Sequence, residues 1–226
     1  MHRTGELYGQ FQNLDQQRET ASLGMWVFLI TEVMFFGGLF LTYTINRSLY
    51  PVAFAESSRE LDVRLGAVNT AVLIVSSLTM ALAVWASQTG KRKQLIAFLL
   101  ATLALGSVFL AIKSVEYADK FHHHLIPGHN FHFPDSNITP VLARQEPNLN
   151  AHSQLFFSLY FGMTGLHALH MVVGVGLLLF LLRQALRGRY TPQYHSPVEI
   201  CGLYWHFVDI VWIYLFPLLY LIDRHR

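Results

Sequence analysis

Residues 23–44 read LGMWVFLITEVMFFGGLFLTYT, and this stretch decides the fold. It is apolar over about the 20 residues that a helix needs to cross a bilayer, yet it holds one ionisable side chain, Glu32, near its middle. A carboxylate at that depth costs roughly 2.5 kcal/mol or more on insertion scales. It stays there when it is protonated, paired or placed in a wet pocket. The rest of the chain is therefore expected to supply polar partners for Glu32.

Two later apolar segments carry side chains of the required kind. His167 and His170 lie in the run FFSLYFGMTGLHALHMVVGVGLLLFLL, and His206 and Asp209 lie in EICGLYWHFVDIVWIYLFPLLYLI. At about 1.5 Å of rise per residue, each lies nearer the middle of its segment than either end. Because intramembrane ionisable residues mark functional sites by default, we interpret this group as a site that handles protons or lipid.

The composition is that of an integral membrane protein. Of the 226 residues, 53% are hydrophobic and 13% are charged, whereas soluble chains carry about 25% charged residues. A net charge of +2 is too small to indicate a nucleic-acid partner. The single cysteine, Cys201, excludes an intrachain disulfide and a Cys-rich metal site. The first twenty-two residues lack an apolar core, so no cleavable signal peptide is expected.

Five apolar segments are long enough to span a membrane as helices. They cover about residues 23–45, 66–88, 95–118, 153–182 and 199–222. Helices are expected because every backbone polar group must be satisfied within lipid. The sequence therefore predicts an all-α integral membrane bundle of five transmembrane helices. In this division residues 1–22 form a polar N-terminal segment and residues 23–226 form the transmembrane domain.

The third and fourth segments hold further residues that the fold must place. Lys113 and Lys120 are expected to extend their ammonium groups toward the membrane interface. Glu116 and Lys120 have the i,i+4 spacing of a helical ion pair. Four glycines of the fourth segment favour close approach of another helix or a lipid: Gly162, Gly165, Gly174 and Gly176.

Two short connections are basic, namely GKRK (Gly90–Lys93) and RQALRGRY (Arg183–Tyr190). The positive-inside rule places such loops, and with them the N-terminus, in the cytoplasm. Arg183 and Arg187 follow the long fourth segment. They are the candidates for binding a phospholipid headgroup, since each basic residue near an anionic surface contributes about 1 kcal/mol.

Several stretches together resemble subunit III of the haem–copper oxidases. The signature stretches are LGMWVFLITEVMFFGGLF (23–40), GLHALHMVVG (165–174) and YWHFVDIVW (204–212), and VNTAVLIVSSLTMALA (68–83) and VEYADKF (115–121) also fit. The resemblance covers nearly all of the chain from Ser22 onward, in the same order and spacing. The larger form of this subunit has two additional N-terminal helices, and this chain resembles the five-helix bacterial form.

The resemblance implies a non-catalytic accessory subunit of a respiratory cytochrome c oxidase in the bacterial inner membrane, with its N-terminus cytoplasmic. Such a subunit contacts the catalytic subunit I, which holds the haems and copper, and assembles with subunit II and other oxidase subunits. It binds phospholipid, supports proton uptake and helps the catalytic subunit to endure turnover. The resemblance implies no cofactor and no catalytic residue in this chain itself.

The motif residues carry over one by one. Glu32 matches the intramembrane carboxylate of the motif E-V-x-F-F, His167 and His170 match H-x-x-H, and His206 and Asp209 match W-H-F-V-D. Two further acids join the candidate proton or lipid site: Glu116 in VEYADKF, and Glu199, which matches an acidic position before the last motif. Relatives serve cytochrome c oxidases, quinol oxidases and nitric oxide reductases. VMFFGG after Glu32 favours the cytochrome c branch.

Other readings of the intramembrane residues are a metal site, a haem b carrier, and a small proton channel or transporter. His167 with His170, and His206 with Asp209, share the i,i+3 spacing of ligands on one helix face, but the resemblance implies no metal there. Bulky neighbours such as Trp205 and Trp212 argue against room for a haem. A transporter would show inverted repeats or broken helices, and the sequence shows neither.

The segment FHHHLIPGHNFHF is rich in histidine, and such tracts bind zinc or copper in some proteins. Its weak candidates for metal ligands are His122, His123, His124, His129 and His132. We favour a solvated loop that contacts another subunit over a metal site.

Overall fold

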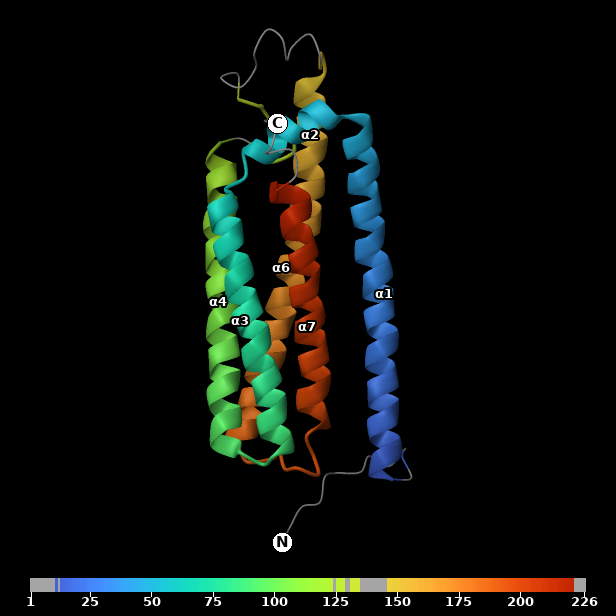
Figure 1. Ribbon diagram of the computed structural model, residues 1–226, viewed down its shortest axis with the longest axis vertical. Coiled ribbons are helices and arrows are strands. Elements are labelled where there is room, and N and C mark those ends of the chain that lie inside the picture. The colour runs from blue at the N-terminus through green and yellow to red at the C-terminus, as the bar shows by residue number, and fades with distance from the viewer. Residues whose placement is uncertain (1–10, 12, 124, 129–130, 135–145, 222–226) are drawn as a thin grey trace. The chain divides into compact units, whose positions relative to one another are not determined.

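The computed structural model describes residues 11, 13–123, 125–128, 131–134 and 146–221. Within those ranges the chain is almost wholly helical (Figure 1), and its one strand-like feature is an isolated bridge between Thr191 and Tyr194. Six α-helices and one π-helical turn are present in the described part. Five of these helices are long and apolar enough to cross a membrane. The predicted all-α membrane fold with five spanning helices is confirmed.

The long helices extend beyond the apolar runs that predict them. They are α1 (Leu14–Leu49), α3 (Val63–Gln88), α4 (Arg92–His122), α6 (Leu149–Leu186) and α7 (Ser196–Phe216). Helix α1 begins well before residue 23 and so crosses the expected boundary of the polar N-terminal segment. Its charged ends suit the helix dipole, because Asp15 lies in the first turn and Arg47 in the last.

Two prolines shape the rest of the chain. The expected connection between the first two spans contains a short helix, α2 (Pro51–Arg59), which begins with Pro51 at a position where no backbone N–H is needed. Helix α7 stops being α-helical at Pro217, which has no N–H to donate to the preceding turn. The chain continues there as the π-helical turn η2 (Pro217–Leu221).

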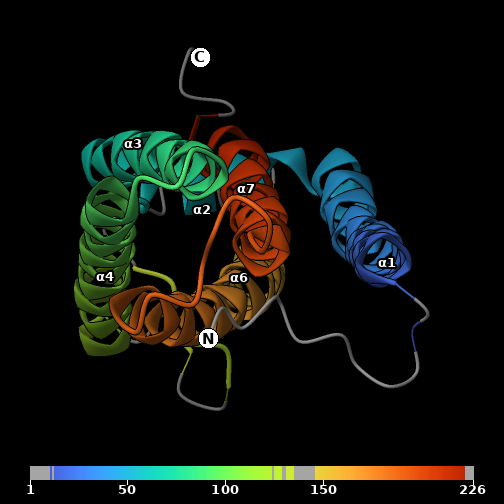
Figure 2. The same ribbon diagram turned by 90° about the horizontal axis from the view of Figure 1, so that it is seen from below.

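The helices divide between two compact units. Unit 1 comprises Met1–Met34, Val72–Val108 and His170–Ile210, and unit 2 comprises Phe35–Ala71, Phe109–Leu169 and Val211–Arg226. Each long helix thus contributes one part to each unit. Within unit 1, the tight turn that joins α3 to α4 can be followed in Figure 2. It closes on Gly90, whose φ of 72° lies in the left-handed region that favours glycine.

The core of unit 1 is organised around the indole of Trp205, which is fully buried in α7. The indole N–H donates to the Ser76 hydroxyl of α3 at 3.0 Å. A methyl group added at Gly106 of α4 would lie 2.8 Å from the Trp205 ring, and one at Gly174 of α6 would lie 2.9 Å from it. Because both glycines leave space that the indole fills, Trp205 contacts three other helices at once.

Replacing Gly174 with Ala is expected to destabilise the chain, because the new methyl group overlaps the Trp205 ring and overpacking costs about 1–3 kcal/mol. Gly176, on the same helix, has nothing within 4 Å of its added methyl group. Gly176→Ala is the matched control, and it is expected to be neutral or to stabilise through helix propensity. The measurement is the midpoint of thermal unfolding of the purified protein. Equal midpoints for the two variants would contradict the packing described for Trp205.

The core of unit 2 is rich in aromatic side chains. Tyr43 of α1 and Phe156 of α6 both contact Phe54 of α2, each with ring centroids 5.4 Å apart. Trp212 of α7 is fully buried, and its indole N–H donates to the Thr70 hydroxyl of α3 at 3.1 Å. Trp212 also contacts Phe109 of α4, with 4.9 Å between ring centroids. One group of contacts therefore joins α1, α2 and α6 within the unit, and a second joins α3, α4 and α7.

Candidate functional site

Glu32 of α1 has a partner within unit 1. Its carboxylate Oε2 lies 3.2 Å from His170 Nε2 of α6, and the two side chains are 19% and 17% exposed. The Tyr204 hydroxyl of α7 donates to the backbone carbonyl of His170 at 2.9 Å, which helps to fix this turn of α6. The structure therefore brings together two of the residues that the sequence singles out. The contact with His170 offsets part of the free-energy cost of removing the Glu32 carboxylate from water.

His206 and Asp209 lie in the same unit but form a separate group. His206 Nδ1 is 2.6 Å from the Ser77 hydroxyl of α3. Asp209 is 1% exposed, and the Ser77 hydroxyl lies near it without the geometry of a hydrogen bond to either carboxyl oxygen. Among the described residues, the recorded ion pair of Glu32 is with His170, and neither His206 nor Asp209 joins it.

His167 belongs to unit 2, where it is 1% exposed. Its ring packs edge-on against Phe109 at 5.4 Å between centroids and lies 5.1 Å from the ring of Trp212. His167 is part of an aromatic core, whereas His170 meets a carboxylate.

The structure corrects the sequence-based pairing of Glu116. Glu116 Oε2 lies 2.9 Å from Lys113 Nζ, and both side chains are only 3% exposed. Lys120, the partner expected from the i,i+4 spacing, donates to the Glu60 carbonyl at 2.6 Å and to Asp119 at 3.2 Å. The expectation that Lys113 reaches the interface is wrong, because the unit 2 core holds a carboxylate and hydroxyl groups that satisfy its ammonium.

Glu199, in the first turn of α7, is one of the residues that line a cavity of about 590 Å³ in unit 1. It accepts a hydrogen bond from Gln88 at 2.6 Å and lies 3.2 Å from His195 Nε2. His206 lines the same cavity. Two of the predicted site residues, Glu199 and His206, thus line the same cavity, and His206 also contacts the Ser77 hydroxyl.

Arg183 and Arg187 are both exposed at the end of α6. The neighbouring Arg92 was not singled out in the sequence, and it is the residue that binds the α6 terminus. Its guanidinium donates to the carbonyl of Ala185 at 3.1 Å and to that of Leu186 at 2.5 Å. Arg92 therefore satisfies carbonyls at the end of α6, and leaves the two predicted arginines available for other contacts.

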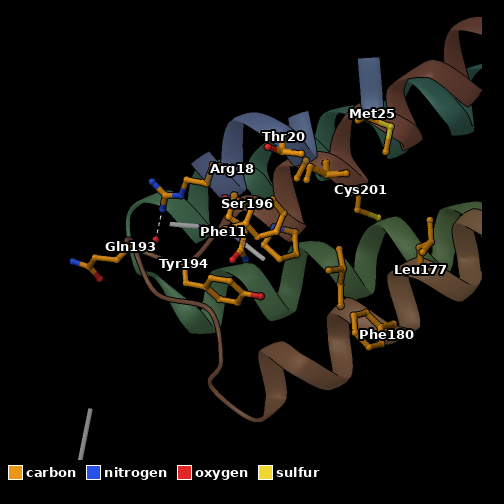
Figure 3. Close-up of a pocket in the computed structure, with 15 residues that line it drawn as sticks. Phe11, Arg18, Thr20, Met25, Leu177, Phe180, Gln193, Tyr194, Ser196 and Cys201 are labelled. Carbon is orange, nitrogen blue, oxygen red and sulfur yellow. Dashed lines mark hydrogen bonds between the residues drawn. The ribbon is translucent and has the colours of Figure 1, made fainter. Parts of the chain in front are cut away.

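A second cavity of unit 1, of about 530 Å³, is shown in Figure 3. Its walls are mainly apolar, with Met25, Leu177, Phe180 and Cys201 among the residues that line it. Arg18 lies at one side, and its guanidinium donates to the Gln193 carbonyl along the dashed line in Figure 3. The cavity therefore combines mainly apolar walls with the guanidinium of Arg18 and the amide side chains of Gln17 and Gln193.

The histidine-rich segment is only partly described. His122 ends α4, His123 Nε2 lies 3.4 Å from Asp119 Oδ1, and His132 is exposed. His124 and His129 lie outside the described residues. Within the described ranges, no three His, Cys, Asp or Glu side chains are grouped as metal ligands.

Sequence reasoning missed Lys113, Ser77 and Arg18 as members of polar groups. Ser77 lies in an apolar run rich in small and hydroxyl residues, where packing is the ordinary explanation. Arg18 lies in the polar segment before the first apolar run. Of the three, only Lys113 could have been recognised from the sequence. It lies three residues before Glu116, and residues with this spacing lie on one helix face and can form an ion pair.

Comparison with known proteins agrees with the motifs. A family profile described as "Cytochrome c oxidase subunit III" matches residues 2–124 and 145–223. The chain is 33% identical over 219 residues to cytochrome c oxidase subunit 3 of Synechocystis sp., covering 96% of this chain and 81% of that protein. It is 31% identical over 199 residues to cytochrome bo(3) ubiquinol oxidase subunit 3 of Pseudomonas aeruginosa, covering 88% and 83%.

The similarity extends to an animal protein, cytochrome c oxidase subunit 3 of Papio hamadryas, at 31% identity over 206 residues, with 87% of this chain and 67% of that protein covered. The profile match includes α1, α2, α3, α4, α6 and α7 and all seven predicted intramembrane site residues. With five spanning helices and the motif residues in sequence order, the chain belongs to the cytochrome c oxidase subunit III family.

Proposed function

We propose that this chain is the non-catalytic, accessory subunit III of a respiratory terminal oxidase that reduces oxygen and pumps protons. The observation that carries the proposal is the family match over every long helix. A member of this family associates with other oxidase subunits. Direct contact with the catalytic subunit I, and assembly with subunit II, are the finer parts of the proposal. The haems and copper belong to those partners, and this chain binds none.

The cytochrome c branch is the favoured one. The matched relatives include subunit 3 of cytochrome c oxidases and of quinol oxidases. The stretch VMFFGG directly after Glu32 supports the cytochrome c branch. Reduction of the purified complex by cytochrome c, and failure of a quinol to replace it, is the expected result. The reverse result assigns the chain to a quinol oxidase.

We place the chain in the bacterial cytoplasmic membrane with its N-terminus in the cytoplasm. Support comes from the basic residues near the α3–α4 turn and the connection after α6: Lys91, Arg92, Lys93, Arg183, Arg187 and Arg189. Lys and Arg in short loops favour the cytoplasmic side.

The groups of unit 1 support a role beside a proton-conducting partner. Glu32 with His170, and His206 with Ser77, are polar contacts formed inside spanning helices. Helix α1, which carries Glu32, is the least buried of the five, with 11% of its most apolar window buried. The remaining surface of α1 is available to lipid or to the catalytic subunit.

The test of the assembly is what copurifies with a tagged copy of this chain from mild detergent. We expect a complex that contains haem and copper and consumes oxygen. A tagged chain that purifies alone and shows its own Soret absorption band would replace the proposal with a haem carrier. A chain that purifies alone without chromophore would favour the channel or transporter reading.

Phospholipid is the further proposed ligand. Replacing both Arg183 and Arg187 with Gln is expected to reduce the anionic phospholipid retained by the purified complex, since each cation near an anionic headgroup contributes about 1 kcal/mol. The matched control is Arg64→Gln, an exposed arginine near the start of α3 in unit 2. Lipid is measured by mass spectrometry per complex. Unchanged lipid in the double variant would rule out the two arginines as headgroup ligands.

A further inference from the structure

The ammonium group of Lys113 is enclosed by oxygen atoms inside unit 2. Its Nζ lies 2.9 Å from Glu116 Oε2, 3.0 Å from the Tyr220 hydroxyl and 3.2 Å from the Tyr160 hydroxyl. A lysine ammonium has three N–H donors and no acceptor, so these three oxygens match its full donor set. Both hydroxyls in turn donate to Glu116 Oε1. The carboxylate and the two phenols therefore form one acceptor cluster.

Aromatic rings surround the same nitrogen. The ring centroids lie 4.9 Å from Nζ for Trp212, 5.3 Å for Tyr160, 5.4 Å for Tyr117 and 5.7 Å for Tyr220. Rings within about 6 Å attract a cation through their quadrupoles, and aromatic cages recognise alkylated ammonium ions in this way. An ion pair between Lys113 and Glu116 does not need aromatic neighbours, so the four rings around the nitrogen are an additional feature of the site.

The walls of this cage are held in place by contacts that do not involve Lys113. The indole N–H of Trp212 donates to Thr70 at 3.1 Å, and the Tyr117 hydroxyl lies 2.6 Å from the Thr164 hydroxyl. Tyr220 lies in η2, where its ring comes close to Gly66 of α3. The cage is therefore preorganised, and it is expected to persist when the lysine side chain is shortened.

We propose that the core of unit 2 is an ammonium-binding site whose resident ligand is the chain's own Lys113 side chain. Its walls come from α4, α6, α7 and η2, so the tethered ammonium holds these segments together as a bound ligand would. The site selects a primary alkylammonium ion, because the three oxygens require N–H donors. A quaternary ammonium ion has the charge but no donor. When Lys113 is shortened to Ala, the space of its stem opens to a free ion such as n-butylammonium.

The test is chemical rescue of Lys113→Ala, purified from the membrane in detergent with everything that copurifies. The variant is expected to unfold at a lower temperature than wild type. With n-butylammonium present from solubilisation onward, the midpoint should recover by more than half of the loss, with a saturable dependence on concentration. Methylammonium should act more weakly because it leaves the stem space empty. Tetramethylammonium and NaCl at equal concentration should give no recovery.

Lys120→Ala is the matched control. Lys120 is also buried near the end of α4, but it donates to a backbone carbonyl and to Asp119, and no ring of the described residues is recorded around its ammonium. Butylammonium should not rescue it. Equal protection of Lys113→Ala, Lys120→Ala and wild type would overturn the proposal, as would equal rescue of Lys113→Ala by tetramethylammonium.

A second variant keeps the proposal testable if Lys113→Ala does not accumulate in the membrane. Lys113→Ala with Glu116→Gln removes the uncompensated carboxylate but keeps all four rings. This double variant should bind butylammonium about tenfold more weakly than Lys113→Ala does, because charge-assisted hydrogen bonds are the stronger kind. If only the double variant can be purified, saturable protection by butylammonium and none by tetramethylammonium supports the cage. No protection by either ion overturns it.

Discussion

Replacing Glu116 with Leu is expected to be among the most destabilising single changes in this chain. The substitution leaves the Lys113 ammonium buried without its carboxylate, and breaking a buried ion pair from one side costs about 3–5 kcal/mol. It also removes the acceptor of the Tyr160 and Tyr220 hydroxyls. The expected result is a large fall in the unfolding midpoint and low accumulation of the subunit in the membrane.

The control is the double variant Lys113→Met with Glu116→Leu, which replaces both charges by apolar side chains of similar size. Replacement of a whole buried pair is often neutral or stabilising, so the double variant should be more stable than Glu116→Leu alone. The measurement is a double-mutant cycle of unfolding midpoints that also includes Lys113→Met. Additive losses in the two single variants would show that Lys113 and Glu116 do not interact.

Removal of the whole subunit is expected to change endurance more than initial chemistry. If the haems and copper lie in partner subunits, the stripped complex should keep its chromophores and a substantial initial rate of oxygen reduction. Its activity should then decline over repeated turnover, and its proton uptake should weaken at higher pH. The measurement follows oxygen consumption over time at several pH values, with visible spectra before and after stripping.

The control for that experiment is the stripped complex with the purified subunit added back, which should recover its endurance. Immediate and complete loss of activity, with loss of a chromophore, would contradict an accessory role. A stripped enzyme as fast and as durable as the intact one would leave the subunit a structural role only.

The five spanning helices could be predicted because continuous apolar runs of about 20 residues have the length of a membrane-spanning helix, in which every backbone polar group is satisfied within the segment. The exact helix ends could not, because α1 begins at Leu14 among polar residues that no membrane constraint covers. The short helix α2 was also missed, since nine residues at the membrane edge leave no apolar run to recognise.

The sequence predicted which residues take part in polar contacts inside the helices, but it predicted only some of the pairs that they form. Glu32 required a partner at its own depth, and His170 is among the candidates that the sequence offered. The choice of His170 over His206 depends on helix rotation, which the apolar pattern does not specify. Glu116 was assigned the wrong lysine because i,i+3 and i,i+4 neighbours are equally close on a helix. The aromatic surroundings of Lys113 decide between them, and these come from three other segments.

The pairing of Glu32 with His170 has a consequence for how the chain is made. His170 leaves the ribosome 138 residues after Glu32, and synthesis proceeds at about 5–20 residues per second. For roughly ten seconds the nascent α1 therefore holds an intramembrane carboxylate whose partner has not been synthesised. The inserted α1 therefore lacks the contact that stabilises its Glu32 carboxylate until α6 has been synthesised and inserted. Slowing translation between residues 49 and 149 should lengthen the period in which quality-control proteases can capture the unfinished subunit.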